Sequence, residues 1–183
     1  HDLEVIYEKP KFLFKKKSFK GRQLKKPILN DLLIGGIYKG NAIGNSSVMV
    51  RKKILIKIGG ISENEDLVAS EDFNTWLRIA EITDRFKYLN KRLGYYLIHE
   101  TSSQKKNLSI PHRQAVIDYM KYFNDKEKLD LEVKLNYMSA NFNTSINYFT
   151  EAIKEFVFVI KNGNINFKIR SFLKIILLIL KRK

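Results

Sequence analysis

Apolar residues follow two different patterns along the chain. Residues 3–7 alternate between apolar and polar side chains, as in a short strand, and short apolar runs between glycines follow them. From Pro111 onward the apolar residues recur every three or four positions, which is the period of a helix. The helices expected there span residues 111–124, 128–145, 146–161 and 167–180. We therefore predict an α/β domain over residues 1–107 and an all-helical extension over 108–183.

Glycines and turn residues bound further elements in the first half. A helix at 28–34 is expected to end at Gly35-Gly36, because glycine readily adopts the left-handed conformation of a helix C-cap. The acidic residues 61–69 indicate a solvated connector. The other expected elements are a strand at 46–50, a helix at 51–58 closed by Gly59-Gly60, and strands at 86–89 and 93–98 around a turn at 90–92.

The segment 70–80 has a strong helix signature. Ser70 is expected to act as N-cap by accepting a hydrogen bond from a first-turn amide, and Glu71 and Asp72 lie where the helix dipole favours carboxylates. The apolar stripe of this helix comprises Phe73, Trp76, Leu77 and Ala80. When that stripe is buried, Asp72 lies at the rim of the helix and faces an expected cleft. The alternative is purely structural, since an acidic first turn stabilises a helix by about 0.3–1 kcal/mol.

The composition excludes some kinds of site and suggests some kinds of partner. The chain has no cysteine, which excludes disulfides, thiolate nucleophiles and cysteine-ligated metals, and we expect a cytoplasmic location. With 34 Lys and Arg against 19 Asp and Glu, the net charge of +15 attracts nucleic acid, anionic lipid or phosphorylated substrates. Because Lys, Ile and Asn share A/T-rich codons, the base composition of the genome is an alternative source of this excess.

Two basic segments bear on the choice of partner. Residues 9–26 combine lysines with interleaved phenylalanines, which can stack on single-stranded nucleic acid, but no nucleic-acid-binding motif accompanies them and a solvated loop is favoured. In residues 167–183, lysine and arginine flank an apolar run that is too short to cross a bilayer. We expect peripheral contact with an anionic membrane there, with packing against neighbouring helices as the alternative.

An ordered set of short segments runs through the first half. It comprises Asn45-Ser46-Ser47-Val48, Ile58-Gly59-Gly60-Ile61, Phe86-Lys87-Tyr88-Leu89, Leu93-Gly94-Tyr95-Tyr96, and His99 with Ser102-Ser103. Its most specific part is Glu71-Asp72 followed by Trp76-Leu77-Arg78. From about Leu3 to about Ser103 the chain thereby resembles the second half of family-2 glycosyltransferases, the inverting GT-A type. The resemblance implies the acceptor-side part of a GT-A (nucleotide-diphospho-sugar transferase) fold.

The resemblance also implies roles for single residues. Asp72 would be the catalytic base that takes the proton of an acceptor hydroxyl, and Glu71 would orient the acceptor or support the loop. Asn45 and Ser46 are candidates for contacts with acceptor hydroxyls. The other substrate-binding candidates are Trp76 and Arg78, for which core packing and an ion pair are the structural alternatives.

A loop implied to close over the donor diphosphate holds a second group of candidates. They are His99, Ser102 and Ser103. Leu97 stands where the family usually has an arginine, so Lys105 and Lys106 are the substitute cations, and a surface histidine without a role is the alternative for His99.

The implied reaction moves a sugar from a nucleotide-diphosphate donor to a hydroxyl of a glycan or lipid-linked acceptor, with inversion. It would serve cell-surface polysaccharide or glycolipid synthesis on the inner membrane face. The divalent cation, Mn²⁺ or Mg²⁺, is expected mainly in an upstream nucleotide-binding half with an Asp-X-Asp motif, which does not occur in these 183 residues. The competing hypothesis is a non-catalytic basic module that binds anionic membrane or nucleic acid.

Overall fold

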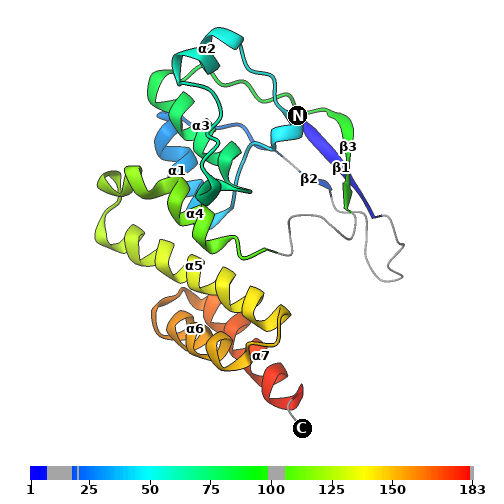
Figure 1. Cartoon of the computed structure of the whole chain (residues 1–183), viewed down its shortest axis with the longest axis vertical. Coiled ribbons are helices and arrows are strands. Elements are labelled where there is room, and N and C mark those ends of the chain that lie inside the picture. The colour runs from blue at the N-terminus through cyan, green and yellow to red at the C-terminus, as the bar shows by residue number, and fades with distance from the viewer. Residues whose placement is uncertain (8–17, 20, 99–105, 182–183) are drawn as a thin grey trace. The chain divides into compact units, whose positions relative to one another are not determined.

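The computed structural model describes residues 1–7, 18–19, 21–98 and 106–181 (Figure 1). The chain forms two compact units, His1–Ser103 and Gln104–Lys183, so the division falls close to the boundary predicted after residue 107. The elements of the first unit are β1 (Asp2–Tyr7), β2 (Ser18–Phe19), α1 (Ile28–Tyr38), η1 (Asn45–Ser47), α2 (Lys52–Lys57), η2 (Glu65–Leu67), α3 (Glu71–Ile82) and β3 (Arg92–Ile98). Those of the second are α4 (Ser109–Val116), η4 (Ile117–Tyr122), α5 (Asp125–Ser145), α6 (Phe149–Asn162) and α7 (Ile165–Lys181).

Strand β1 lies at the centre of a three-stranded sheet with the order β2-β1-β3. It pairs with β2 in antiparallel and with β3 in parallel orientation, and Leu3 lies opposite Gly94 in the parallel pair. The two strands predicted in β1 and β3 are thus confirmed. Because parallel strands cannot be joined by a hairpin, the chain between them makes a long crossover, which includes α1, α2 and α3. The assignment of this topology to a GT-A fold stays a prediction.

The buried Asp2 carboxylate joins three parts of the first unit. Its Oδ1 accepts hydrogen bonds from the backbone N–H of Gly21 at 2.9 Å and from the hydroxyl of Tyr88 at 2.7 Å. The bond to Asp2 raises the pKa of the Tyr88 hydroxyl, with burial and the aspartate charge acting in the same direction. One acceptor atom therefore connects the start of β1 with the segments that follow β2 and α3.

Two predicted strands are wrong. Residues 46–50 begin inside the 3-10 helix η1, where both the backbone N–H and the hydroxyl of Ser47 bond to the carbonyl of Gly44 at 3.0 and 2.9 Å. Residues 86–89 form no strand, and the Phe86 N–H bonds locally to the carbonyl of Asp84 at 3.0 Å. Both segments have strand-forming side chains, but their backbone groups do not join the sheet, and propensity alone does not supply a pairing partner.

Helix α1 begins where predicted but continues through Gly35-Gly36 to Tyr38, so its predicted end is wrong. The glycines serve packing rather than termination. A Cβ atom at Gly36 would lie 2.7 Å from Cζ of Phe73, a buried ring of α3. The left-handed residue that follows the helix is instead Gly40, with a φ of 88°.

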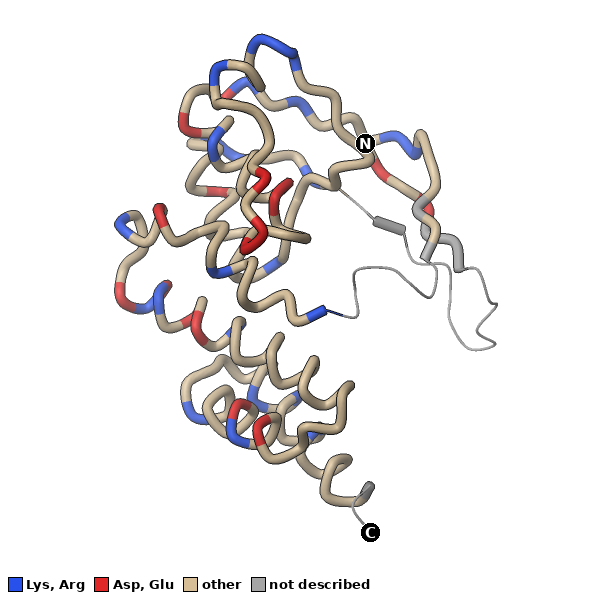
Figure 2. The backbone as a smooth tube through the Cα atoms, in the orientation of Figure 1, with Lys and Arg blue, Asp and Glu red and all other residues tan. Residues whose placement is uncertain are grey.

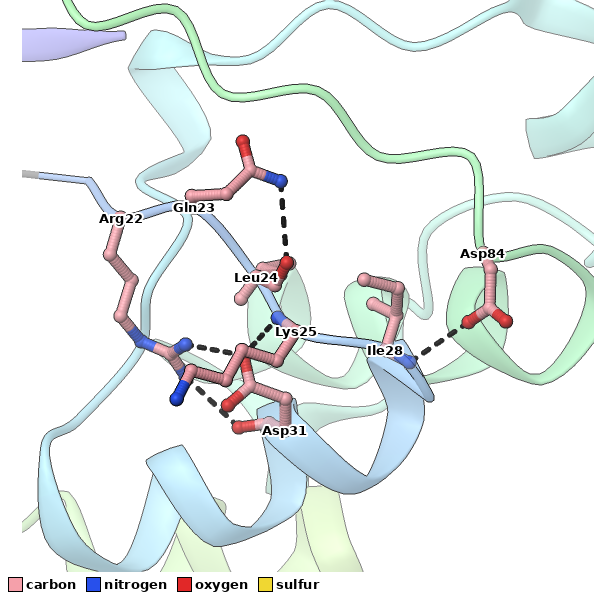
Figure 3. Close-up of polar contacts among 7 residues, drawn as sticks. All are labelled: Arg22, Gln23, Leu24, Lys25, Ile28, Asp31 and Asp84. Carbon is pink, nitrogen blue, oxygen red and sulfur yellow. Dashed lines mark hydrogen bonds and ion pairs between the residues drawn. The ribbon is translucent and has the colours of Figure 1, made fainter.

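Side chains from distant segments fix the start of α1 (Figure 3). The Oδ1 atom of Asp84 accepts a hydrogen bond from the N–H of Ile28 at 2.8 Å, and Asp31 pairs with Arg22 and accepts from the N–H of Lys25 at 2.9 Å. Burial opposes ionisation of Asp31, but the bonds from Arg22 and Lys25 outweigh it and lower the pKa of this carboxyl. The bond to Asp84 satisfies the amide of Ile28, a first-turn group that has no partner within the helix.

Helices α5, α6 and α7 of the second unit pack around a shared core cluster. Its members are Ala140, Ala152, Phe156 and Leu178. Tyr137 of α5 makes edge-to-face contacts with Phe156 of α6 and Phe167 of α7, with ring centroids 5.9 and 5.1 Å apart. The four helices predicted here are confirmed, except that the first is divided into α4 and η4. Among the described residues, no helix has the length and apolarity needed to cross a membrane.

Lys134 is a half-buried cation in α5. Burial lowers its pKa to about 8. The folded state therefore disfavours the charged form of this lysine relative to the unfolded chain.

We expect Gly36→Ala to lower the free energy of unfolding of the first unit by about 1–3 kcal/mol, because the added methyl group meets the buried Phe73 ring. The higher helix propensity of alanine, worth about 1 kcal/mol, offsets only part of this loss. Urea unfolding followed by the fluorescence of Trp76, the only tryptophan, measures the effect. Gly36→Ala combined with Phe73→Leu should cost less than the sum of the single substitutions, and additive losses would contradict the close packing.

Lys134→Met should change how stability depends on pH. Between a pH of about 8 and roughly 10.4, the unfolded lysine binds a proton that the folded one has released, so wild-type stability rises with pH in this window. Relative to the methionine variant, the wild type should therefore gain stability as the pH increases from below to above this window. Unfolding free energies on both sides of the window measure the gain, with the same substitution at exposed Lys161 as control. A constant difference between wild type and Lys134→Met would contradict the prediction.

Candidate functional site

The Asp72 carboxylate lies in the first turn of α3 and is held from two sides. Its Oδ2 accepts a hydrogen bond from Nδ2 of Asn41 at 3.1 Å, and its Oδ1 accepts from the N–H of Phe73 at 2.6 Å. Oδ1 of Asn41 accepts in turn from the N–H of Ile43 at 3.0 Å. This local turn fixes the amide that donates to Asp72. The loop after α1 and the start of α3 together orient the carboxylate.

Burial raises the pKa of Asp72 above the usual value for an aspartate. The negative charge of Glu71 acts in the same direction, whereas the hydrogen bonds from the Phe73 N–H and from Asn41 oppose the shift. A carboxylate with a raised pKa binds a proton more strongly than an exposed aspartate does. The environment of Asp72 is therefore suited to a proton acceptor.

Glu71, the preceding residue, provides an acceptor atom without a donor. Its Oε2 is buried, and no hydrogen bond to this atom occurs within the part of the chain that the structure describes. A buried acceptor in this state costs about 1–3 kcal/mol, which a hydroxyl group of a bound molecule would remove. The start of α3 thus combines a held carboxylate with an unsatisfied one.

Ser70 precedes α3 as predicted, but the predicted side-chain cap is wrong. Its hydroxyl makes no capping hydrogen bond. With φ of −138° and ψ of 8°, the Ser70 backbone is not in the extended conformation that normally directs an N-cap side chain at the first-turn amides. The Asp72 carboxylate accepts from one of those amides, the Phe73 N–H.

The side chains of Trp76 and Arg78 make structural hydrogen bonds within the first unit. The buried indole of Trp76 donates from Nε1 to the carbonyl of Ile43 at 3.1 Å, which attaches α3 to the loop that contains Asn41. The Arg78 guanidinium donates hydrogen bonds to the carbonyls of Ile58 and Gly60, both at 2.8 Å. These partners are backbone carbonyls and not the carboxylate that the predicted ion pair requires. The Trp76 side chain is therefore part of the core, and Arg78 stabilises the turn after α2.

No contact among the described residues joins the remaining predicted site residues to Asp72. Asn45 and Ser46 are exposed in η1, and their contact with an acceptor stays a prediction. Lys106 is exposed at the start of the described part of the second unit. The residues His99, Ser102, Ser103 and Lys105 lie outside the described residues.

Asn41 is the functional candidate that sequence reasoning missed. It lies in the glycine-bounded turn 40–44, between α1 and η1. An asparagine whose Oδ1 caps the amide two residues later keeps its Nδ2 free to donate elsewhere, and this turn chemistry is the signal that could have identified it.

The described residues contain no group of three or more His, Cys, Asp or Glu side chains that could hold a metal ion. The divalent cation that the glycosyltransferase resemblance implies is expected mainly in an upstream half, so its site stays a prediction. In comparisons with family models, curated proteins and solved structures, the chain matches none.

Asn41→Ala should raise the pKa of Asp72 further, because it removes a hydrogen bond that favours the charged carboxylate. Carboxyl ¹³C chemical shifts followed through a pH titration measure this change directly. Asn45→Ala is the matched control, since Asn45 is an exposed asparagine a few residues away and should leave the titration of Asp72 unaltered. An unchanged or lowered pKa in Asn41→Ala would show that the Asn41 amide does not stabilise the carboxylate.

Proposed function

We propose that this chain is the acceptor-side part of an inverting glycosyltransferase, which moves a sugar from a nucleotide-diphosphate donor to an acceptor hydroxyl. The observation that carries the proposal is the Asp72 carboxylate, which is half-buried, oriented by Asn41 and raised in pKa at the start of α3. The Glu71-Asp72 and Trp76-Leu77-Arg78 motif supports the same assignment through its resemblance to family-2 enzymes.

The proposed chemistry requires a base. An acceptor hydroxyl has too high a pKa to attack an anomeric carbon unaided, so a carboxylate within about 2.6–3.2 Å must take its proton as the new bond forms. In the proposal, Asp72 takes this proton while the acceptor oxygen bonds to the anomeric carbon. The bond from that carbon to the donor phosphate breaks on the opposite side, and the leaving diphosphate keeps the electron pair. This in-line displacement inverts the anomeric configuration.

Glu71 has a binding role in this proposal. Its buried Oε2 accepts a hydrogen bond from a second hydroxyl of the acceptor, which orients the acceptor and satisfies the glutamate. Asn41 is a positioning residue, because it acts on the acceptor only through Asp72. As the resemblance implies, the nucleotide and its cation are assigned to a nucleotide-binding part outside the described residues, and no step here depends on the cation.

The proposed setting is the cytoplasmic face of a membrane, with a glycan or lipid-linked acceptor for cell-surface polysaccharide or glycolipid synthesis. The net charge of +15 suits a negatively charged donor and an anionic surface. In the competing hypothesis of a non-catalytic basic module, Glu71 and Asp72 only stabilise the start of α3. The two hypotheses differ in what they expect of a variant at position 72.

Asp72→Asn, in the full-length protein that contains this chain, should keep donor binding but lose on the order of 10²-fold or more in turnover, because the proton acceptor is removed. Turnover is measured as nucleoside diphosphate released from a panel of nucleotide sugars in the presence of acceptor, and donor binding by calorimetry. Asp66→Asn is the matched control, since Asp66 is an exposed aspartate in η2. Near-normal turnover of Asp72→Asn would remove Asp72 from the mechanism, and a wild type without turnover on any donor would favour the non-catalytic module.

A further inference from the structure

Helix α7 is attached to the second unit by one stripe of side chains. Ser171 and Leu178 are buried and lie seven residues apart, which places them on the same side of the helix. Ile175, between them, packs against the core cluster of α5, α6 and α7. Together with the Phe167 ring, which packs against Tyr137 of α5, this stripe attaches α7 to its own unit.

The turn before α7 fixes the helix at its other end. A Cβ atom at Gly163 would lie 2.6 Å from the carbonyl oxygen of Val159 and 3.1 Å from Cβ of Phe167, so the turn closes tightly on the last turn of α6. The Oδ1 atom of Asn164 accepts a hydrogen bond from the N–H of Phe167 at 3.1 Å and caps the first turn of α7. The position of α7 on its unit is thus defined by packing and by its cap.

The outward face of α7 exposes large apolar side chains along its whole length. They recur at helical spacing and comprise Ile165, Ile169, Phe172, Leu173, Ile176, Leu177, Ile179 and Leu180. A continuous apolar face of this kind is uncommon on a surface without a partner, because it leaves apolar area in contact with water. This face therefore indicates a binding surface.

The charged residues of α7 itself are all positive. Residues 156–183 contain seven Lys and Arg residues and no Asp or Glu, and Figure 2 shows the distribution of charged residues along the backbone. At about 3.6 residues per turn, Lys168, Arg170 and Lys174 fall at the edges of the apolar face and not within it. A partner that fits α7 must offer both an anionic surface and an apolar interior.

We propose that α7 lies in the plane of a lipid bilayer that contains anionic headgroups. Its apolar face enters the boundary between headgroups and acyl chains, and the flanking cations contact lipid phosphates. A second copy of the chain fits less well, because a symmetric contact through α7 brings identical cations together. Nucleic acid offers phosphates but no apolar interior for eight aliphatic and aromatic side chains. Membrane binding requires neither donor nor Asp72, so the inference is independent of the proposed transferase activity.

The test uses the full chain and vesicles of phosphatidylcholine with or without phosphatidylglycerol, which are separated from free protein by sedimentation. We expect binding to the vesicles that contain phosphatidylglycerol and at least roughly tenfold weaker binding to phosphatidylcholine alone. Arg170→Gln combined with Lys174→Gln should weaken binding to the anionic vesicles by about fivefold for each cation removed.

Insertion of the apolar face is tested by Phe172→Ser combined with Leu180→Ser, whose side chains are 58% and 62% exposed. We expect at least roughly tenfold weaker binding to anionic vesicles, because two apolar side chains no longer leave water. The matched control is Ile110→Ser combined with Tyr148→Ser, which are 63% and 61% exposed in the same unit but lie outside α7. This control should bind as the wild type does, and circular dichroism of all variants checks that their helices are retained.

Equal binding to both kinds of vesicle, or undiminished binding of the Phe172→Ser/Leu180→Ser variant, would overturn the proposal. A stable dimer that this variant abolishes would also overturn it, because a second copy would then cover the apolar face. Transferase activity is assayed separately with a water-soluble acceptor. Loss of vesicle binding without loss of that activity, or the reverse, distinguishes a failure of this inference from a failure of the proposed function.

Discussion

The packing of α3 against α1 is the contact on which the candidate site depends. Glycine at position 36 allows the buried Phe73 ring to approach the α1 backbone, and Phe73 directly follows Asp72 in the first turn of α3. One turn later, the indole of Trp76 bonds to the loop after α1, the same loop that contains Asn41. The carboxylate and the amide that binds it are therefore positioned by two contacts of a single helix.

The start of α3 contains groups that folding alone does not favour. Burial disfavours the charged form of Asp72, and the buried Oε2 of Glu71 has no donor among the described residues. Carboxylates that merely complement a helix dipole gain their small benefit while exposed to water, so burial is not needed for that role. Functional sites typically contain groups that lower the local stability, and the rest of the fold must compensate for them. Such groups separate this helix start from an ordinary acidic first turn.

The sequence predicted the helices of the second unit well because each one buries a stripe of regularly spaced apolar residues. It failed for the strands at 46–50 and 86–89, since a local pattern does not reveal whether a partner strand exists. It assigned Gly35-Gly36 to a helix end because the Phe73 ring that requires them lies in a helix much later in the chain. For the same reason Asp72 was identified from its sequence neighbours, whereas Asn41 was found only through the fold.

The parallel pairing of β1 with β3 has a consequence for how the protein folds. Leu3 meets Gly94 only after the whole crossover between them has been synthesised, so the sheet depends on a contact between residues that are far apart in the sequence. The second unit instead consists of helices that pack on their neighbours along the chain, and such local topologies form rapidly. Early in folding, the first strand has an unpaired edge that can join another chain. During this interval the first unit, and not the helical one, is the part of the molecule most exposed to misassembly.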